Sequence, residues 1–461
     1  MKEKILVMNK IITDLLKDAL DNIDNLNDYY NSQKEYVRNY VAVNLEKYKY
    51  GVMIDHYFWK KIVNLDEYVI SQREQEEIDK IILNYSVEEK DDGYVVTYKL
   101  NSQMDFSGYE MDPQIAKTSF IKLVKQPAIL NESMIMMLLV KYEEAIAGIY
   151  RFLLEAYPQA YLSGKSITYA ELVSVESNFE DIKERFIDKE IDEFMRLSIS
   201  DWYKTFETKH TAKFEFKDKD FDNFKEVYYR RNLIVHNQGI VNEIYKNNIP
   251  ESSVKIGEQL EVDEEYLNSA FSFARKILIG TIWGLRKTAD DIAELNEYLF
   301  NYGYECMKME KWDIAEYIFQ MLITDKKQED IDVKCEQVNM WISIKNGKGI
   351  DQIRGEVEGL DVSAMQVQFI VAKYALLDDF EKVNIYLERA IDKDIPAWCV
   401  DDWPLFKQYR RSSQYHDFVN LHKDLFETKG YEPNKETVDL TGDEISVLEG
   451  EMKKEVAITK E

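Results

Sequence analysis

NESMIMMLLVKYEEAIAGIYRFLLEAYP, residues 131–158, is the stretch that decides the fold class. Its apolar residues recur every three or four positions, as on one face of an α-helix, and a proline marks its end. Asn131 is the predicted N-cap of this helix. The patterns at 181–206 and 262–287, with a helix that begins near Asp222, extend it into a predicted bundle of four or five helices.

The chain before this bundle is the least informative part. Residues 1–125 open with a helical pattern and continue through a tyrosine-rich stretch, and DDGYVVTYKL at 91–100 alternates like a strand after a turn. We predict a small mixed N-terminal region, α+β in character and of unknown role. The bundle itself is predicted over residues 130–287, and the whole chain is expected to be mainly α.

After the bundle, residues 291–425 carry a faint internal period. Small and packing residues recur at comparable offsets in three segments, first at Gly303, Ala315, Phe319 and Leu322, next at Trp341, Ile353 and Val357, and last at Tyr374, Phe380, Val383, Leu387 and Ala390. The pattern predicts a short α-solenoid of tetratricopeptide-like repeats. Two or three unrelated helical hairpins are the alternative. Residues 431–461 are acidic and without pattern, and are predicted to be disordered.

The composition is that of a soluble globular protein, because apolar residues make up 45% and charged residues 31% of 461 positions. Only 17 glycines and 7 prolines are present, which favours helices. The cysteines Cys306, Cys335 and Cys399 form neither a disulfide framework nor a metal motif. The N-terminus lacks a signal-peptide pattern, and no window approaches the 18 or so apolar residues of a membrane span. We therefore expect a cytoplasmic protein without a membrane segment.

The net charge of −27 limits the nucleic-acid partners that the chain can have. Acids outnumber Lys and Arg by 86 to 59, whereas affinity for a phosphate backbone normally rests on a surplus of bases. The balance reverses over 209–231, which hold seven bases and five acids. The chain is therefore not expected to coat nucleic acid indiscriminately. A small site for one exposed RNA segment remains possible.

The candidate site lies in YYRRNLIVHNQGIVNEIY, residues 228–245, where Arg231, Asn232 and His236 supply groups that can cut RNA without a metal. An imidazole can take the proton from a ribose 2′-hydroxyl, and a guanidinium can neutralise the charge that grows on the attacked phosphate. Asn232 and His236 are four residues apart and therefore lie one above the other on a helix.

Arg231 falls in the apolar row of the same helix, together with Phe224, so its guanidinium needs an anionic partner or a bound phosphate. Arg231 and His236 are five positions apart and do not align on an ideal helix. They can reach one phosphate if the helix ends near His236, and Gly239 is available there for a left-handed residue. Glu143 and Glu144 lie where an earlier helix can face the site, but acids on helices are usually solvated.

The stretch 228–245 resembles the HEPN domain (higher eukaryotes and prokaryotes nucleotide-binding) in the form found in bacterial defence-associated members. The resemblance covers roughly residues 130–287 and includes the ITYAELVS and IDKEIDEFMRLSISDWYKTF segments. It implies an all-α bundle and a metal-independent endoribonuclease without a cofactor. It also implies a homodimer in which two motif helices face each other across one cleft. Arg231 would then hold the phosphate, Asn232 would orient the histidine or the arginine, and His236 would be the acid/base.

Two functions stay open at this point. The first is an RNase effector of a bacterial defence or toxin system, which cuts cytosolic RNA (tRNA or mRNA) and answers to a trigger through its repeats and N-terminal region. The second is an inactive interaction scaffold that dimerises and binds a protein partner. In that case His236 is an ordinary histidine at a helix end, and Arg231 is half of an internal ion pair.

Overall fold

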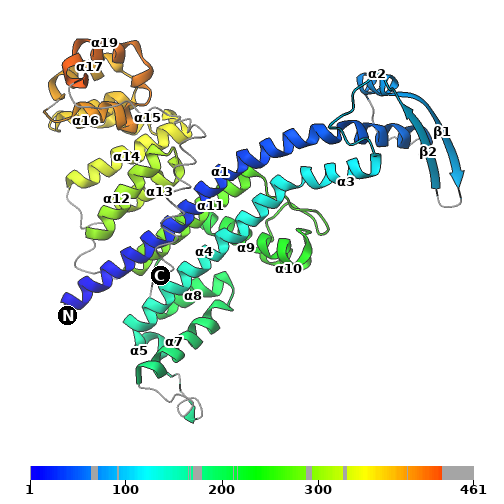
Figure 1. Cartoon of the computed structure of the whole chain (residues 1–461). Helices are drawn as coiled ribbons and strands as arrows, with labels where there is room; N and C mark the ends of the chain where they lie inside the picture. The colour runs from blue at the N-terminus through cyan, green and yellow to red at the C-terminus, as the bar shows by residue number, and fades with distance from the viewer. Residues whose placement is uncertain are drawn as a thin grey trace, which may run out of the picture. The chain divides into compact units, whose positions relative to one another are not determined.

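The computed structural model describes residues 2–63, 71–90, 93–164, 166, 168–169, 179–210, 212–214, 216, 218–286, 293–324, 330–391 and 393–427. These residues are mainly α-helical, with a small antiparallel sheet within residues 82–100 (Figure 1), which confirms the predicted mainly α class. The chain forms two compact units, Met1–Asn301 and Tyr302–Glu461. The predicted disordered tail and most of the ITYAELVS segment lie outside the described residues.

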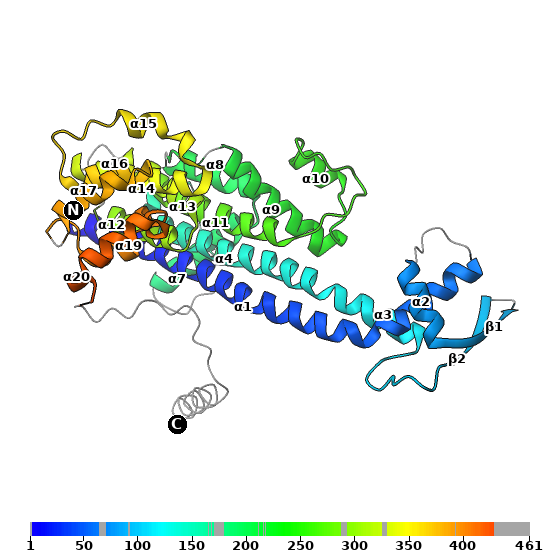
Figure 2. The ribbon, with the colours of Figure 1, turned by 90° about the horizontal axis from the view of Figure 1, so that it is seen from above.

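A single long helix organises the first unit. α1 (Lys2–Val63) lies along α3 (Pro113–Val124), α4 (Gln126–Ala156) and α11 (Glu264–Leu285), as Figure 2 shows. Its buried residues, such as Leu16 and Leu20, follow the helical spacing. The N-terminal residues therefore share one compact unit with the helices that we predicted from residue 130 onward.

A β-hairpin follows the far end of α1. α2 (Gln72–Ile81) begins at a capping box formed by Ser71 and Glu74, and leads into β1 (Ile82–Lys90) and β2 (Gly93–Leu100). The two strands pair antiparallel, so the strand predicted within 91–100 is confirmed over residues 93–100. A buried core lies against the hairpin and includes Tyr57, Phe58, Ile78, Ile81 and Ile82.

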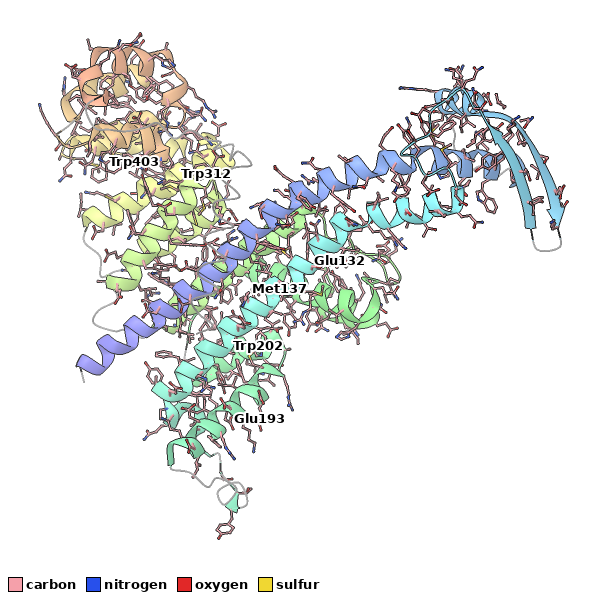
Figure 3. All side chains as sticks on the ribbon, viewed as in Figure 1. Glu132, Met137, Glu193, Trp202, Trp312 and Trp403 are labelled. Carbon is pink, nitrogen blue, oxygen red and sulfur yellow. The ribbon has the colours of Figure 1, made fainter. Side chains whose placement is uncertain are left out.

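The rest of the first unit is a bundle built around α4, which buries ten of its side chains. Its further helices are α5 (Pro158–Leu162), α7 (Phe179–Met195), α8 (Ile199–His210), α9 (Asp218–Asn237) and α10 (Glu243–Asn248). The amphipathic stretch predicted at 181–206 is thus two helices, interrupted between residues 195 and 199. Trp202 on α8 (Figure 3) is fully buried among aromatic rings.

Three buried hydroxyls link the bundle helices. The Tyr142 hydroxyl on α4 is hydrogen-bonded to that of Tyr203 on α8, and Tyr203 is hydrogen-bonded to Thr281 Oγ1 on α11 at 2.8 Å. Thr281 in turn donates to the backbone carbonyl of Ile277 at 2.6 Å. Each of these buried polar groups therefore has a partner, as a packed interior requires.

The predicted N-cap at Asn131 is wrong. α4 already begins at Gln126, with a proline in its first turn, and Asn131 lies inside the helix. Its amide Nδ2 donates to the Val262 carbonyl at 2.8 Å, and its Oδ1 accepts from the Tyr30 hydroxyl at 3.0 Å. Asn131 thus connects α4 to α1 and to the segment before α11, contacts that local sequence cannot show.

The helical segment Pro113–Ala156 is long and apolar enough, by length and composition, to cross a membrane. The expectation of a chain without a membrane segment stays a prediction. The 18-residue window that passes this test is 28% buried in the structure, and Leu138 and Ile146 are among the buried residues of α4. A core helix of a bundle passes the same test, so the finding is weak evidence.

The second unit continues the helical pattern. Its helices are α12 (Ala293–Lys308), which crosses from the first unit, α13 (Trp312–Ile323), α14 (Asp330–Lys348), α15 (Arg354–Gly359), α16 (Val367–Leu376), α17 (Phe380–Ala390), α18 (Ala397–Asp402), α19 (Ser413–Leu421) and α20 (Lys423–Glu427). Short 3₁₀ turns lie at Ile350–Gln352, Pro404–Phe406 and Tyr409–Arg411.

The helices of this unit pack as hairpins, α13 against α14 and α16 against α17. A Cβ at Gly303 would lie 3.0 Å from the ring of Phe319, so the small residue allows close contact between helices. Hairpins of this kind are what stacked repeats require. Their assignment to tetratricopeptide-like repeats stays a prediction.

Candidate functional site

The motif lies at the C-terminal end of α9, where the helix is closed by two residues in left-handed conformation. α9 starts at Asp218, four residues before the predicted start, and ends at Asn237. Gln238 and Gly239 follow with φ of 54° and 76°, and the Gly239 amide donates to the Leu233 carbonyl at 3.0 Å. The helix end beside His236 and the left-handed glycine are therefore confirmed.

Gly239 meets two requirements at once. Its positive φ disfavours any residue with a Cβ, and a Cβ there would lie 2.6 Å from Gln259 Nε2. The chain returns past this glycine, so that the Leu260 amide donates to the Gly239 carbonyl at 2.9 Å and the Val241 amide to the Glu258 carbonyl at 2.8 Å. The segment 239–241 is thus held against 258–260 directly after the motif.

Arg231 forms an ion pair inside the unit. Its Nη2 donates to Oε1 of Glu143 on α4, so the alternative of an internal ion pair is what the structure shows for this residue. The Arg231 side chain is 23% exposed, and its guanidinium lies 4.9 Å from the centre of the Tyr228 ring. Within the described residues, the buried Nε of Arg231 has no hydrogen-bond partner. One donor of this guanidinium is therefore unused.

Glu143 changes the electrostatics that the sequence suggested. Burial, followed by the nearby Glu143 carboxylate, raises the pKa of Tyr228, and Arg231 opposes this shift. The guanidinium and the carboxylate compensate each other, so a phosphate at Arg231 must displace Glu143 or share the cation with it. Glu144, in contrast, is 56% exposed and pairs with Lys141 on its own helix.

His236 lies in the last turn of α9 and is exposed. No hydrogen bond joins its ring to another residue in the part of the chain that the structure describes. His236 is thus open to solvent and to a ligand, rather than buried against its own core.

Asn232 is half-buried, one turn before His236 on the same face of α9. Within the described ranges, its amide forms no hydrogen bond with His236 or Arg231. The structure therefore places Asn232 beside the histidine along the helix but shows no contact that orients either partner.

Arg230 contacts other partners than Arg231 does. Its Nε donates to Oε1 of Glu226 at 2.8 Å, its Nη1 donates to the Glu261 carbonyl at 2.8 Å, and its guanidinium stacks on the Tyr266 ring at 3.9 Å. The sequence interpretation missed Glu226 and Tyr266. The available signal was the four-residue spacing of Glu226 and Arg230 on one helix.

Exposed apolar residues lie one turn from both partners of the Arg231–Glu143 pair. Val235, four residues after Arg231, is 50% exposed, and Val140, three residues before Glu143, is 43% exposed. Met137, one turn further along α4 (Figure 3), is exposed as well. α4 and α9 are in contact and lie side by side in Figure 2. These apolar side chains lie in water on two neighbouring helices, beside the charged pair.

In the described part of the chain, no group of three or more His, Cys, Asp or Glu side chains is placed to hold a metal ion. Comparisons with protein-family models, with curated proteins and with solved structures gave no match to this chain.

Proposed function

We propose that this protein is a metal-independent endoribonuclease of the HEPN type, with Arg231, Asn232 and His236 as its site. The proposal rests on two observations near the C-terminal end of α9, one on the guanidinium of Arg231 and one on the imidazole of His236. Within the described residues, the buried Nε–H of Arg231 has no hydrogen-bond partner, and a phosphate oxygen that reached it would satisfy it. His236 is exposed in the last turn of the same helix.

The proposed reaction transfers the phosphate within the RNA chain. His236 accepts the proton of a ribose 2′-hydroxyl, and the 2′-oxygen forms a bond to phosphorus while the bond from phosphorus to the 5′-oxygen breaks. A protonated His236 of a second copy supplies the proton to the leaving 5′-oxygen. Arg231 stabilises the negative charge on the phosphate oxygens during the attack. The products are a 2′,3′-cyclic phosphate and a 5′-hydroxyl.

A homodimer through α4 and α9 is part of the proposal. Val140 and Val235 leave apolar surface in water beside the Arg231–Glu143 pair, and a symmetric contact would bury the same surface on both copies. Such a contact brings two copies of the motif helix together, which supplies one imidazole as base and one as acid. The apolar surface thus supports the same arrangement as the chemistry.

The proposed setting is a bacterial defence or toxin system acting on cytosolic RNA. A constantly active RNase would harm its own cell, and most of this chain lies outside the proposed site. The helical hairpins of the second unit and the N-terminal region, with its β1–β2 hairpin, are suited to receive a protein trigger or regulator. This step rests on analogy between folds.

The second candidate function is an inactive scaffold that dimerises and binds a protein partner. The Arg231–Glu143 ion pair favours it, because the pair neutralises the cation that would hold the phosphate. The net charge of −27 favours it as well, since such a chain repels nucleic acid at a distance.

Cleavage of total bacterial RNA by the purified chain, with a chelator present, tests the proposal directly. We expect fragments that end in a 2′,3′-cyclic phosphate and begin with a 5′-hydroxyl, identified by end-specific labelling. Loss of cleavage in the chelator would contradict the metal-independent mechanism. Absence of cleavage with and without co-expressed cellular partners would favour the scaffold.

Val235→Glu is expected to dissociate the dimer and to lower cleavage in parallel, because it places a carboxylate in the apolar contact of each copy. Analytical ultracentrifugation over a concentration series measures the first effect, and the RNA assay the second. Val43→Glu is the matched control, since Val43 is 75% exposed on α1 of the same unit. A Val235→Glu protein that stays dimeric would show that the contact lies elsewhere.

A further inference from the structure

We propose that Glu226 is a positioning residue for His236, because its carboxylate ties α9, α10 and α11 into the frame that fixes the end of the motif helix. The inference rests on the proposed function for its catalytic consequence. Its structural consequence can be measured without any RNA.

One carboxylate receives hydrogen bonds from three elements. Glu226 Oε1 accepts from Arg230 Nε at 2.8 Å and from the Tyr245 hydroxyl on α10 at 2.7 Å. Its Oε2 accepts from the Tyr266 hydroxyl on α11 at 2.6 Å. Charge-assisted hydrogen bonds of this kind are the strong ones in proteins. Both oxygens of Glu226 are therefore engaged in contacts that cross from one helix to the next.

The surroundings keep these donors in place over the working pH range. Burial, followed by the charge of Glu226, raises the pKa of Tyr245 to about 12 and that of Tyr266 well above its usual value. Burial alone lowers the pKa of Arg230, but Tyr266 and Glu226 raise it overall. Both hydroxyls and the guanidinium thus keep their protons wherever the enzyme is expected to work.

The hydrogen bonds of Glu226 influence His236 through the segment that follows the motif helix. The segment 239–241 pairs with 258–260, and these two segments flank α10 in sequence. α10 is fixed to α9 by Tyr245 and by a second hydrogen bond, from the Tyr229 hydroxyl to Asn248 at 2.8 Å. A small buried core holds this region together and consists of Leu233, Val241, Tyr245 and Leu260.

His236 contributes little to its own placement. It is exposed, and within the described residues its ring has no hydrogen bond, so its position follows from that of the backbone of the last turn. That backbone is closed by the bond from the Gly239 amide to Leu233. Freedom in the 239–260 pairing would therefore become freedom of the imidazole. A small displacement of a catalytic group is enough to lower a rate strongly.

Glu226→Ala and Glu226→Gln test this inference, with Asp24→Asn as the matched control. Asp24 accepts from the buried Arg275 guanidinium at 2.6 Å and joins α1 to α11, so its loss also breaks a carboxylate–arginine contact in the same unit. Hydrogen exchange of the Gly239 and Val241 amides measures the helix end. Steady-state kinetics on RNA separates kcat from KM.

In Glu226→Ala, we expect exchange at Gly239 and Val241 to accelerate at least about tenfold, and kcat to fall about 10²-fold with little change in KM. Glu226→Gln should recover part of both effects, because an amide oxygen can still accept from Arg230 and Tyr245. Asp24→Asn should leave exchange at these two amides unchanged.

Equal exchange at Gly239 and Val241 in wild type and in both Glu226 variants would overturn the inference. So would a rise that Asp24→Asn reproduces, since Glu226 would then act only on the stability of the unit. If Glu226→Ala does not fold, Glu226→Gln decides by the same readings. A wild type that cuts no RNA would defeat the proposed function, whereas the exchange data would still judge the role of Glu226.

Discussion

His236→Ala is expected to lower the rate of RNA cleavage about 10²- to 10⁴-fold, the range that general acid–base catalysis contributes. The imidazole is exposed at the end of α9, and no described residue is hydrogen-bonded to it, so its removal should cost little stability. We therefore expect the variant to have the melting temperature and oligomeric state of the wild type. Initial rates on a defined RNA, with thermal unfolding in parallel, provide the measurement.

His56→Ala is the control for this prediction, because His56 is an exposed histidine on α1 in the same unit. It should cleave RNA at the wild-type rate. If His236→Ala also keeps the wild-type rate, His236 is an ordinary histidine at a helix end. Any RNase activity of the protein would then have to be sought at another place on the chain.

Arg231→Lys is expected to lower cleavage about 10²-fold while it changes the free energy of unfolding by less than about 1 kcal/mol. A lysine can keep the ion pair with Glu143, since an ammonium needs only proximity to a carboxylate. It cannot present the planar set of donors with which a guanidinium holds two oxygens of one phosphate. The substitution therefore separates the structural role of Arg231 from its proposed catalytic role.

Arg151→Lys is the matched control for Arg231→Lys. Arg151 lies on the same α4 helix as Glu143 and pairs with Glu184 and Asp188 on α7, so it is also an arginine in an ion pair between helices. It should retain both stability and cleavage. Wild-type cleavage by Arg231→Lys would mean that the ion pair with Glu143 is the whole function of the residue, which is the outcome the scaffold reading requires.

The parts of this structure that depend on neighbouring residues could be predicted from the sequence. The strand at 93–100 follows from alternation after a turn, and the helix end at His236 follows from the left-handed preference of Gly239. Each of these features is fixed by interactions within a few residues.

The parts that depend on distant residues could not be predicted. Glu143 and Arg231 are 88 positions apart, and nothing local shows that one carboxylate is paired while its neighbour Glu144 is solvated. The Asn131 side chain could cap a helix, but it is hydrogen-bonded to Tyr30 and to Val262 instead, both more than a hundred residues away. The same holds for Glu226, whose tyrosine partners belong to two later helices.

The hydrogen bonds among the buried hydroxyls of Tyr142, Tyr203 and Thr281 have a fixed donor and acceptor at each step. The Thr281 hydroxyl donates its single proton to the Ile277 carbonyl, so Thr281 can only accept a hydrogen bond from Tyr203. Tyr203 has then used its own proton and can only accept from Tyr142. All three hydrogen bonds are therefore donated in the same direction, from α4 through α8 to α11. Phenylalanine at position 203 would leave the Tyr142 hydroxyl without its acceptor and Thr281 without its donor.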